Sequence, residues 1–480
     1  MRKNIIALIA VQLWKSTFKS SAIYMLMVLM GVIITFAAYS GWKMYTVQNG
    51  IREYYQHEAR ESWESNPDKH PHRMAHYGSF AFRRKHPLSM FDFGMESFTG
   101  NAVYLEAHKQ NTVNFSEASF STGLLRFGEI SMAMVLQVVI PLVIFFLGFS
   151  SIAADRESGT LKVMLTQGAT WKELLAGKSV GLLSLTMLFF LPCAIVTTGL
   201  LVGNGHTTGD VLMRFSGLLL TYLCYYFIVG VITVIISAVS KSSKDALIRL
   251  LAIWLFFVIL LPKTTQAIGS YMYPSPSKVA FESALEEDII RQGDSHNPDD
   301  PHYKAIKDSL LSVYQVDSVQ KLPFNYSGFI MREGERLSAV TYERHLNELL
   351  RVYGHQNKLN RITAFINPFT AVRNVSMAFS GTDFSSYVNF QHEAEAYRYQ
   401  LAQTMNELQM KYISNDVKNS ADKRAILDRK HWQEFPDFKY VFQSTRISIK
   451  NEALSIVALL LWLGIAALLI QLLSKKLKAI

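Results

Sequence analysis

The chain of 480 residues has only two cysteines, Cys193 and Cys224, and both lie inside apolar runs. Two such cysteines imply no disulfide framework and leave the redox compartment open. The chain also has no internal repeat and no low-complexity tract. The sequence therefore gives no sign of a disulfide-rich scaffold or a repeat array.

Nucleotide and hydrolase motifs are missing as well. Gly177-Lys178-Ser179 has the ending of a phosphate-binding loop, but Lys172 stands where that motif needs a glycine. The chain should therefore have no ATP site of its own. His57 and His392 each precede a glutamate, as in zinc peptidases, but neither has a second histidine one helical turn later. No nucleophile-elbow serine is present, so an external hydrolase has little support.

Charge is unevenly distributed along the sequence. Half of the residues are hydrophobic and the mean hydropathy is positive, although 18% of the residues are charged. The net charge of +10 could suggest nucleic acid, but the basic residues cluster beside the apolar runs. That placement is typical of the positive-inside rule. We therefore expect a lipid bilayer as partner, and no nucleic acid.

Six apolar runs are long enough, or nearly so, to cross a bilayer, which takes about 20 helical residues. They cover approximately residues 21–41, 130–154, 180–202, 211–240, 246–268 and 453–474. The fifth has only 13 uncharged residues between Arg249 and Lys263, so it could be tilted, kinked or partly re-entrant. Pro141 and Pro192 lie inside spans, either as kinks that let helices shift or as tolerated prolines.

Ionisable groups are nearly absent inside the predicted spans. Apart from the ends of the fifth, the spans contain no carboxylate, lysine or histidine. Ion-coupled carriers usually need such groups at mid-membrane, so their absence argues against a secondary transporter. Energy for transport would have to arrive through a contact outside the membrane.

Basic residues flank the spans in three short regions. They are Arg2, Lys3, Lys15 and Lys19 before the first span, Lys241, Lys244 and Arg249 between the fourth and fifth, and Lys475, Lys476 and Lys478 after the last. With six spans, all three regions share one side, which is then cytoplasmic. Both termini should be cytoplasmic, and the first span should be an uncleaved anchor.

The two longest connections, about 90 and about 180 residues, are then outside. Apolar residues at helical spacing predict a helix capped by Ser277 and stopped by Gly293, another ending at Gly354, and a third over residues 390–412. We predict an all-α integral membrane protein with six transmembrane helices and a mainly helical extracytoplasmic domain built from both loops. The expected parts are residues 1–41 (cytoplasmic N-terminus and first span), 42–129 (first loop), 130–268 (spans two to five, with a cytoplasmic segment at 153–179), 269–452 (second loop) and 453–480 (sixth span and cytoplasmic C-terminus).

The histidines form one conspicuous group. All 13 lie in segments assigned to the outside, and His70, His72 and His76 fall within KHPHRMAHYG. With Met74 or His57 nearby, they could bind a soft or borderline metal ion. The alternative is an exposed, proline-broken loop whose histidines only pack or hydrogen-bond, since no second cluster has the fixed ligand spacing of a metal site.

The densest motif is the polar segment between the second and third spans. Residues 155–157, Asp-Arg-Glu, end the apolar run, and Gly159 breaks the helical pattern. Thr170 and Glu173 form a capping-box pattern that opens the next helix. We interpret this segment as a cytoplasmic element on which a partner protein acts.

Residues 154–162, ADRESGTLK, followed by Leu165 and by residues 173–178, ELLAGK, resemble the E-R-E-x-G-T-L…L-L…GK pattern of type-2 ATP-binding-cassette permeases. In that family the pattern lies between the second and third spans and includes the coupling helix that docks on the ATPase subunit. Asp155 stands where glutamate is commoner. Gln167-Gly168 replaces a proline-containing turn, which leaves the geometry of the turn open.

Other segments resemble a bacterial subgroup of this family with enlarged outer loops and no settled substrate. They are HPHRMAHYGSFAF, PLSMFDFGMESFTGNAVYLEAHKQN, LLRFGEI, VLQVVIPL, NPFTAVRNVSMAFSGTDF and NFQHEAEAYRYQLAQTMNELQ. Together the resemblance covers most of the chain. It implies six spans per permease, a second permease that is identical or paralogous, and two separate ATPase subunits.

The resemblance implies the membrane subunit of an ATP-driven exporter of unknown substrate in the bacterial inner membrane. Such a chain is not an enzyme and binds no cofactor, because ATP and Mg²⁺ are held by the partner ATPase. The residues implied for coupling are Asp155, Arg156, Glu157, Gly159, Thr160, Leu161, Glu173 and Lys178. The alternative for Arg156 and Glu157 is an interfacial pair that anchors a helix end.

A second functional hypothesis is mechanical transmission. Some type-2 relatives use ATP-driven motion to act on an extracytoplasmic partner protein without moving a solute, and a large exterior with a histidine-rich loop suits this role. A receptor or anchor without energy coupling would leave the coupling pattern unexplained.

Overall fold

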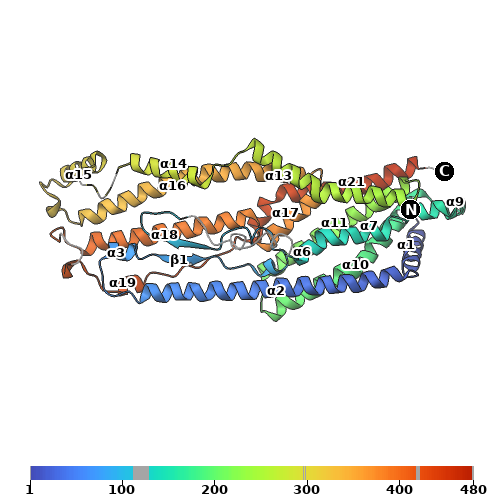
Figure 1. Cartoon of the computed structure of the whole chain (residues 1–480), viewed down its shortest axis with the longest axis horizontal. Coiled ribbons are helices and arrows are strands. Elements are labelled where there is room, and N and C mark those ends of the chain that lie inside the picture. The colour runs from blue at the N-terminus through green and yellow to red at the C-terminus, as the bar shows by residue number, and fades with distance from the viewer. Residues whose placement is uncertain are drawn as a thin grey trace.

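The chain forms a long, mainly helical molecule (Figure 1). The computed structural model describes residues 2–111, 129–293, 295, 297, 299–417 and 422–477. Apolar helices gather at one end of the molecule, and a second part that contains the only sheet of the described residues lies at the other end. The predicted all-α class is confirmed, with one small two-stranded sheet added.

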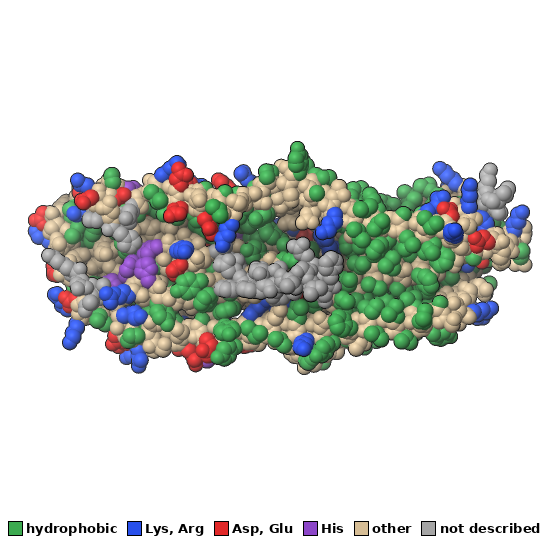
Figure 2. All heavy atoms as spheres, viewed as in Figure 1, with side chains coloured by type: hydrophobic (Ala, Val, Ile, Leu, Met, Phe, Trp, Pro, Cys, Tyr) green, Lys and Arg blue, Asp and Glu red, His purple; other side chains and the backbone are tan. Residues whose placement is uncertain are grey.

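Six helices of the described residues are long and apolar enough to cross a membrane, as the sequence predicts. They are α2 (Ser21–Glu64), a second span over Met132–Glu157, α10 (Trp171–Gly203), α11 (Gly209–Val239), a fifth span over Ser243–Met272 and α21 (Ala453–Lys476). The second span and α11 are mostly buried, whereas the fifth span and α21 are mostly exposed. Figure 2 shows the resulting hydrophobic surface over this half of the molecule. Lipid or another chain must cover it.

The second and fifth spans each contain a π-helical turn. The second consists of α6 (Met132–Met134), η2 (Val135–Val139), α7 (Ile140–Gly148) and α8 (Ala153–Glu157), and the fifth of α12 (Ser243–Trp254), η3 (Leu255–Leu260) and α13 (Leu261–Met272). Both π turns end just before a proline, Pro141 or Pro262, whose ring cannot continue the regular ladder. The fifth span is thus one continuous helix with a local irregularity.

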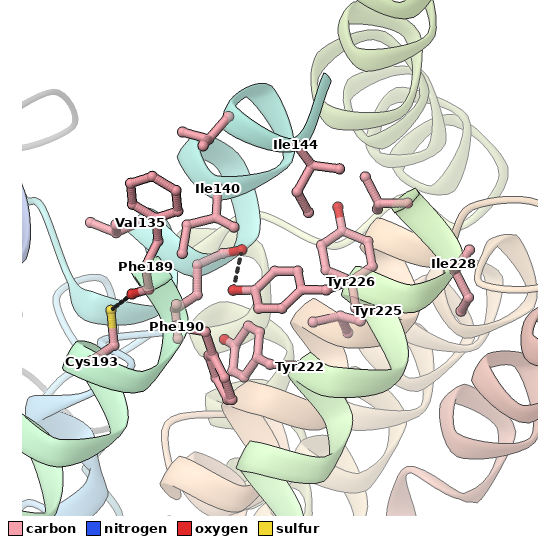
Figure 3. Packing of buried hydrophobic residues seen from close by; sticks show 14 of the residues in the cluster. Val135, Ile140, Ile144, Phe189, Phe190, Cys193, Tyr222, Tyr225, Tyr226 and Ile228 are labelled. Atoms are coloured by element: carbon pink, nitrogen blue, oxygen red, sulfur yellow. Dashed lines mark hydrogen bonds between the residues drawn. The ribbon is translucent and has the colours of Figure 1, made fainter. Parts of the chain in front are cut away.

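Three tyrosines of α11 pack against the π turn of the second span (Figure 3). The Tyr226 hydroxyl donates to the carbonyl of Leu136 at 3.1 Å, and the Tyr225 hydroxyl donates to the carbonyl of Gln137 at 3.4 Å. The Gln137 amide in turn donates to the Tyr222 hydroxyl at 2.8 Å. Because a π turn disturbs the regular helical hydrogen bonds, its carbonyls need other donors, and the Tyr225 and Tyr226 hydroxyls supply them.

The two long connections form the distal part, which we define as the described residues within 65–111 and 273–452. Its first stretch contains α3 (Pro71–Ala75), β1 (Ser79–Phe82), η1 (Pro87–Met90) and β2 (Ala102–Leu105). Its second contains α14 (Lys278–Arg291), α15 (Pro301–Tyr314), η4 (Val319–Lys321), α16 (Tyr326–Thr363), α17 (Pro368–Ser380), α18 (Phe384–Tyr412), η5 (Lys423–Ala425), α19 (Lys430–Gln433) and α20 (Thr445–Asn451). The strands are antiparallel, with Ser79 opposite Leu105. The long α2 continues out of the bundle beside them (Figure 1).

The two stretches pack on each other through shared hydrophobic clusters. Trp63 at the end of α2 and Met74 of α3 lie in one cluster with Leu401 and Met405 of α18 and with Trp432. The Trp63 indole N–H donates to the carbonyl of Trp432 at 2.9 Å, so a polar contact fixes this apolar interface. Chain segments more than 300 residues apart thus form one core.

Most predicted helices of the distal part are present. Ser277 caps α14 by accepting from the N–H of Ala280 at 3.1 Å, and Gly293 follows the helix with φ of 100°. The helix over residues 390–412 is α18. The predicted stop at Gly354 is wrong, because α16 continues to Thr363. A single glycine costs a helix only about 1 kcal/mol, which packing along a long helix can offset.

Both ends of the described chain lie at one end of the molecule. There α1 (Lys3–Thr17), α9 (Thr160–Thr166) and the end of α21 come together (Figure 1). Lysine and arginine side chains gather over the same end in Figure 2. The sequence did not predict α1.

Candidate functional site

The polar segment between the second and third spans forms a helical elbow, residues 153–178. α8 ends before Gly159, which has φ of 77°, and α9 begins directly after it. Gly168, with φ of 92°, follows α9, and Thr170 caps α10. These φ values lie in the left-handed region, which glycine adopts without steric cost. The two glycines therefore set the direction of α9 relative to both spans.

Arg156 and Glu157 connect the elbow to the turn between α11 and α12. The Arg156 guanidinium donates to the carbonyls of Ala238 and Ser240, both at 2.6 Å. These carbonyls end α11, where a cation is favoured. The Glu157 carboxylate accepts from the N–H of Ser243 at 2.8 Å and from its hydroxyl at 2.7 Å, at the start of α12. Each side chain therefore anchors the end of a different helix.

Asp155 and Glu173 bind the elbow to α10 and to the N-terminus. The Lys178 ammonium lies 2.8 Å from the Asp155 carboxylate. Glu173 closes the predicted capping box with Thr170. It also accepts from the backbone N–H and from the guanidinium of Arg2, both at 2.9 Å. Displacement of the elbow must therefore strain contacts to α1, α10, α11 and α12 together.

One face of α9 is open to another protein. Leu161 is 1% exposed and seats α9 on the bundle. Val163 points away from the bundle and is 52% exposed. We define the docking face as the exposed residues of α9 and its C-cap, namely Thr160, Lys162, Val163, Thr166 and Gln167. Of the eight residues that the resemblance implies for coupling, Thr160 belongs to the docking face. Most of the others contact other parts of this chain.

The α1 helix lies along α10, next to the elbow. A Cβ atom at Gly177 would lie 2.7 Å from Cβ of Ile9, and one at Gly181 would lie 3.0 Å from Cα of Ala10. Glycine at both positions lets the two helices approach closely. The Gly-x-x-x-Gly spacing of Gly177 and Gly181 is a sequence signal that could have indicated this contact.

A cavity of about 1100 Å³ lies where the bundle meets the distal part. Its wall comes from η2, η3, α13, α16 and α17 and from the segment after η1. Charged and amide groups line it, among them Lys263, Gln266, Asn357, Arg373 and Glu452. A cavity of this size is large enough for a polar small molecule. No sequence pattern indicated it, because its residues come from distant segments.

A buried hydrogen-bond chain runs from the cavity wall to the second span. The Ser376 hydroxyl donates to the Asp92 carboxylate at 2.5 Å and lies 2.8 Å from the Tyr222 hydroxyl, which accepts from Gln137. Burial raises the pKa of Asp92 and lowers the pKa of Arg373, which also lines the cavity. Changes at the cavity wall are thus coupled by direct contacts to the π turn of the second span.

The structure brings together two of the three histidines that the sequence singled out. The Nε2 atoms of His72 and His76 lie 3.2 Å apart. His70 has a different role, because its Nδ1 atom accepts from the N–H of His72 and caps α3. The third member of the cluster is His108, which the sequence analysis did not single out. It follows β2, and the pairing of β1 with β2 carries it back to α3.

A comparison with protein families matches residues 278–441 to a domain of unknown function, DUF3526. The match covers about a third of the chain and lies within the second stretch of the distal part. It includes neither the elbow nor any of the six apolar helices. No curated protein matches the chain. The fold described above is that of a multi-pass helical membrane protein.

Proposed function

We propose that the chain is the membrane subunit of an ATP-driven exporter, a permease of the type-2 ATP-binding-cassette class. The observation that carries this proposal is the elbow. A short helix with an exposed face sits between two spans, and Arg156 and Glu157 join it to two more helix ends. A push on α9 would therefore reach the second to fifth spans together. The pattern of residues 154–178 supports the same class.

In this proposal the elbow and both termini are cytoplasmic, in a bacterial inner membrane. The distal part is then the extracytoplasmic domain built from two loops. The placement of α1, α9 and the end of α21 at one basic end of the molecule supports this orientation (Figures 1 and 2). ATP and Mg²⁺ belong to two separate ATPase subunits. A second permease, identical or paralogous, would cover exposed apolar surface such as that of the fifth span.

Transport requires a place for the substrate. The cavity of about 1100 Å³ lies at the junction of bundle and distal part, and its wall combines apolar side chains with charged groups of both signs. We propose it as a substrate chamber on the extracytoplasmic side. The hydrogen-bond chain from Asp92 to Gln137 would link it to the second span, and hence to the elbow.

The docking face gives the direct test. Val163→Asp places a charge on the exposed centre of α9, and Val279→Asp makes the same change on exposed α14 of the distal part, where Val279 is 73% exposed. The proposed ATPase subunit should co-purify with the native protein and with Val279→Asp, and be lost from Val163→Asp. Equal recovery with all three proteins would reject α9 as the ATPase contact.

The second candidate is an ATP-driven transmitter that acts on an extracytoplasmic partner protein and moves no solute. The observation in its favour is the size of the distal part, which is built from about 220 described residues of the chain. A transporter should show ATPase activity stimulated by its substrate. A transmitter should instead retain an external protein through purification and show no solute stimulation.

A further inference from the structure

Three histidines converge on the surface of the distal part, far from the elbow. His72 lies on α3, His76 caps its C-terminus, and His108 lies in the turn after β2. One ring nitrogen of each lies within 4.8 Å of the others. Figure 2 shows histidine side chains gathered in a patch over the region where Figure 1 labels α3.

The spacing of the first two histidines matches metal ligation. Their Nε2 atoms lie 3.2 Å apart, since residues four apart share one face of a helical turn. Two nitrogens bound tetrahedrally to one zinc ion, each at about 2.0 Å, lie about 3.3 Å apart. The same distance also fits a hydrogen bond between two neutral imidazoles. A third histidine placed to bind the same ion would favour metal binding over the hydrogen bond.

His108 is the third histidine of the cluster, and a buried carboxylate orients it. Glu335 of α16 is fully buried, and its Oε2 atom accepts from the N–H of His108 at 2.8 Å and lies 3.3 Å from its Nδ1 atom. The contact to the N–H holds His108 at φ of 63°, which non-glycine residues rarely adopt. With Nδ1 directed at Glu335, the Nε2 side of the ring is the one that a metal would meet. Carboxylates orient metal-binding histidines in this way in many proteins.

A further shell supports Glu335. The guanidinium of Arg398 lies 2.7 Å from Glu335 Oε1 and 2.8 Å from Glu395. The same guanidinium donates to the carbonyl of Glu106, two residues before His108, at 3.1 Å. The third histidine is therefore held by groups from α16 and α18, which is the rigidity that a preformed ligand set needs.

We propose that His72, His76 and His108 bind one divalent ion of the zinc and copper group. Three imidazoles suit these borderline ions, and a three-histidine set leaves a fourth position for water or an external ligand. Bound metal joins α3 to the turn after β2, and through Glu335 to α16. The inference is independent of the transport proposal, because it rests on the distal part alone.

The test is metal binding by the full chain, purified in detergent through a tag that contains no histidine. After loading with Zn²⁺ or Cu²⁺ and removal of free metal, the native protein should carry one equivalent. The His72→Asn/His76→Asn double variant should carry none. Both positions are at least partly exposed, so the change should not unfold the chain. His392→Asn, at an exposed histidine outside the cluster, is the matched control and should bind like the native protein.

Glu335→Gln tests the orienting role. It should keep the stoichiometry and weaken the affinity about 10- to 100-fold. If Glu335 serves only the fold, Glu335→Gln would lower the thermal midpoint and leave the metal affinity unchanged. Metal should also raise the thermal midpoint of the native protein, and not that of the double variant.

Two results would overturn the proposal. The first is a native protein without metal after loading, which would leave only a hydrogen-bonded histidine pair. The second is full metal binding by the double variant together with loss of metal binding by His57→Asn. That result would assign the ion to the exposed group of His57, Glu58 and Glu61.

Discussion

The carboxylate of Glu157 accepts two hydrogen bonds from Ser243, one from the backbone N–H at 2.8 Å and one from the hydroxyl at 2.7 Å. This contact joins the end of the second span to the start of the fifth. Glu157→Ala removes it while leaving the docking face unchanged. We expect the variant still to bind the ATPase, but the coupling between ATPase activity and transport should fall by about 5- to 150-fold.

The measurement is substrate-stimulated ATPase activity of the reconstituted complex, together with co-purification of the ATPase. Glu282→Ala, at an exposed glutamate of α14, is the control and should behave like the native protein. Leu161→Ala should also reduce coupling, but Leu161 is buried, so this variant loses packing as well. Normal stimulation in Glu157→Ala would show that the Ser243 contact only anchors a helix end.

The contact between α1 and α10 predicts a stability difference between two glycines of one helix. An added Cβ at Gly177 would lie 2.7 Å from Cβ of Ile9, whereas one at Gly199 would meet no atom within 4 Å. Gly177→Ala should therefore cost about 1–3 kcal/mol through overpacking. Gly199→Ala should be neutral, or stabilise by up to about 1 kcal/mol. The thermal unfolding midpoint in detergent measures both, and equal midpoints would contradict a close α1–α10 contact.

A buried histidine predicts how stability depends on pH. Burial, reinforced by the positive charge of Arg214, lowers the pKa of His86 to about 3, although Asp210 and Glu96 oppose this shift. The unfolded chain binds a proton at this site below about pH 6.5, and the folded chain does not. Above about pH 6.5 the His86 site binds no proton in either state, so its titration does not reduce the free energy of unfolding. Below that pH, the free energy of unfolding falls by about 1.4 kcal/mol for each pH unit.

His86→Asn separates this titration from the role of His86 in the fold. The His86 Nδ1 atom accepts from the N–H of Leu88 at 3.2 Å and caps η1, and an asparagine side chain can make the same cap. The thermal midpoint of the variant should change less than that of the native protein between about pH 7 and 5. Parallel curves for the two proteins would mean that His86 is not responsible for the pH dependence.

The features that sequence could predict are those with a local signal. The apolar runs, the capping box of Thr170 and Glu173, and the cap at Ser277 all depend on neighbouring residues, and all three are present. The predicted helix end at Gly354 was wrong because α16 packs against other helices along its length, so one unfavourable residue does not end this helix. Local propensity is a weak signal when tertiary packing opposes it.

The candidate sites depend on partners far away in the sequence. The partners of Arg156 and Glu157 lie more than 80 residues further along the chain, and no pattern near the elbow could identify them. His108 reaches α3 only because β1 pairs with β2. The cavity wall likewise needs the bundle and the distal part to be folded together. Such sites follow from tertiary structure, and the sequence indicates only some of their residues.

The orientation of the chain can be tested by labelling single cysteines in a variant that lacks Cys193 and Cys224. Val163 on α9 and Val279 on α14 are 52% and 73% exposed, so Val163→Cys and Val279→Cys should both react with a maleimide. Three apolar helices separate them, namely α10, α11 and the fifth span. Because three is odd, the two cysteines should lie on opposite sides of the membrane.

We expect a membrane-impermeant maleimide to label Val279→Cys in intact spheroplasts. Val163→Cys should react only after permeabilisation, and the chain should be expressed without its ATPase so that the docking face stays open. The reverse pattern would invert the orientation and place the elbow outside, where no ATP is available. Labelling of both cysteines from one side would show that one of the three intervening helices does not cross the membrane. The fifth span, which is mostly exposed, would be the first to examine.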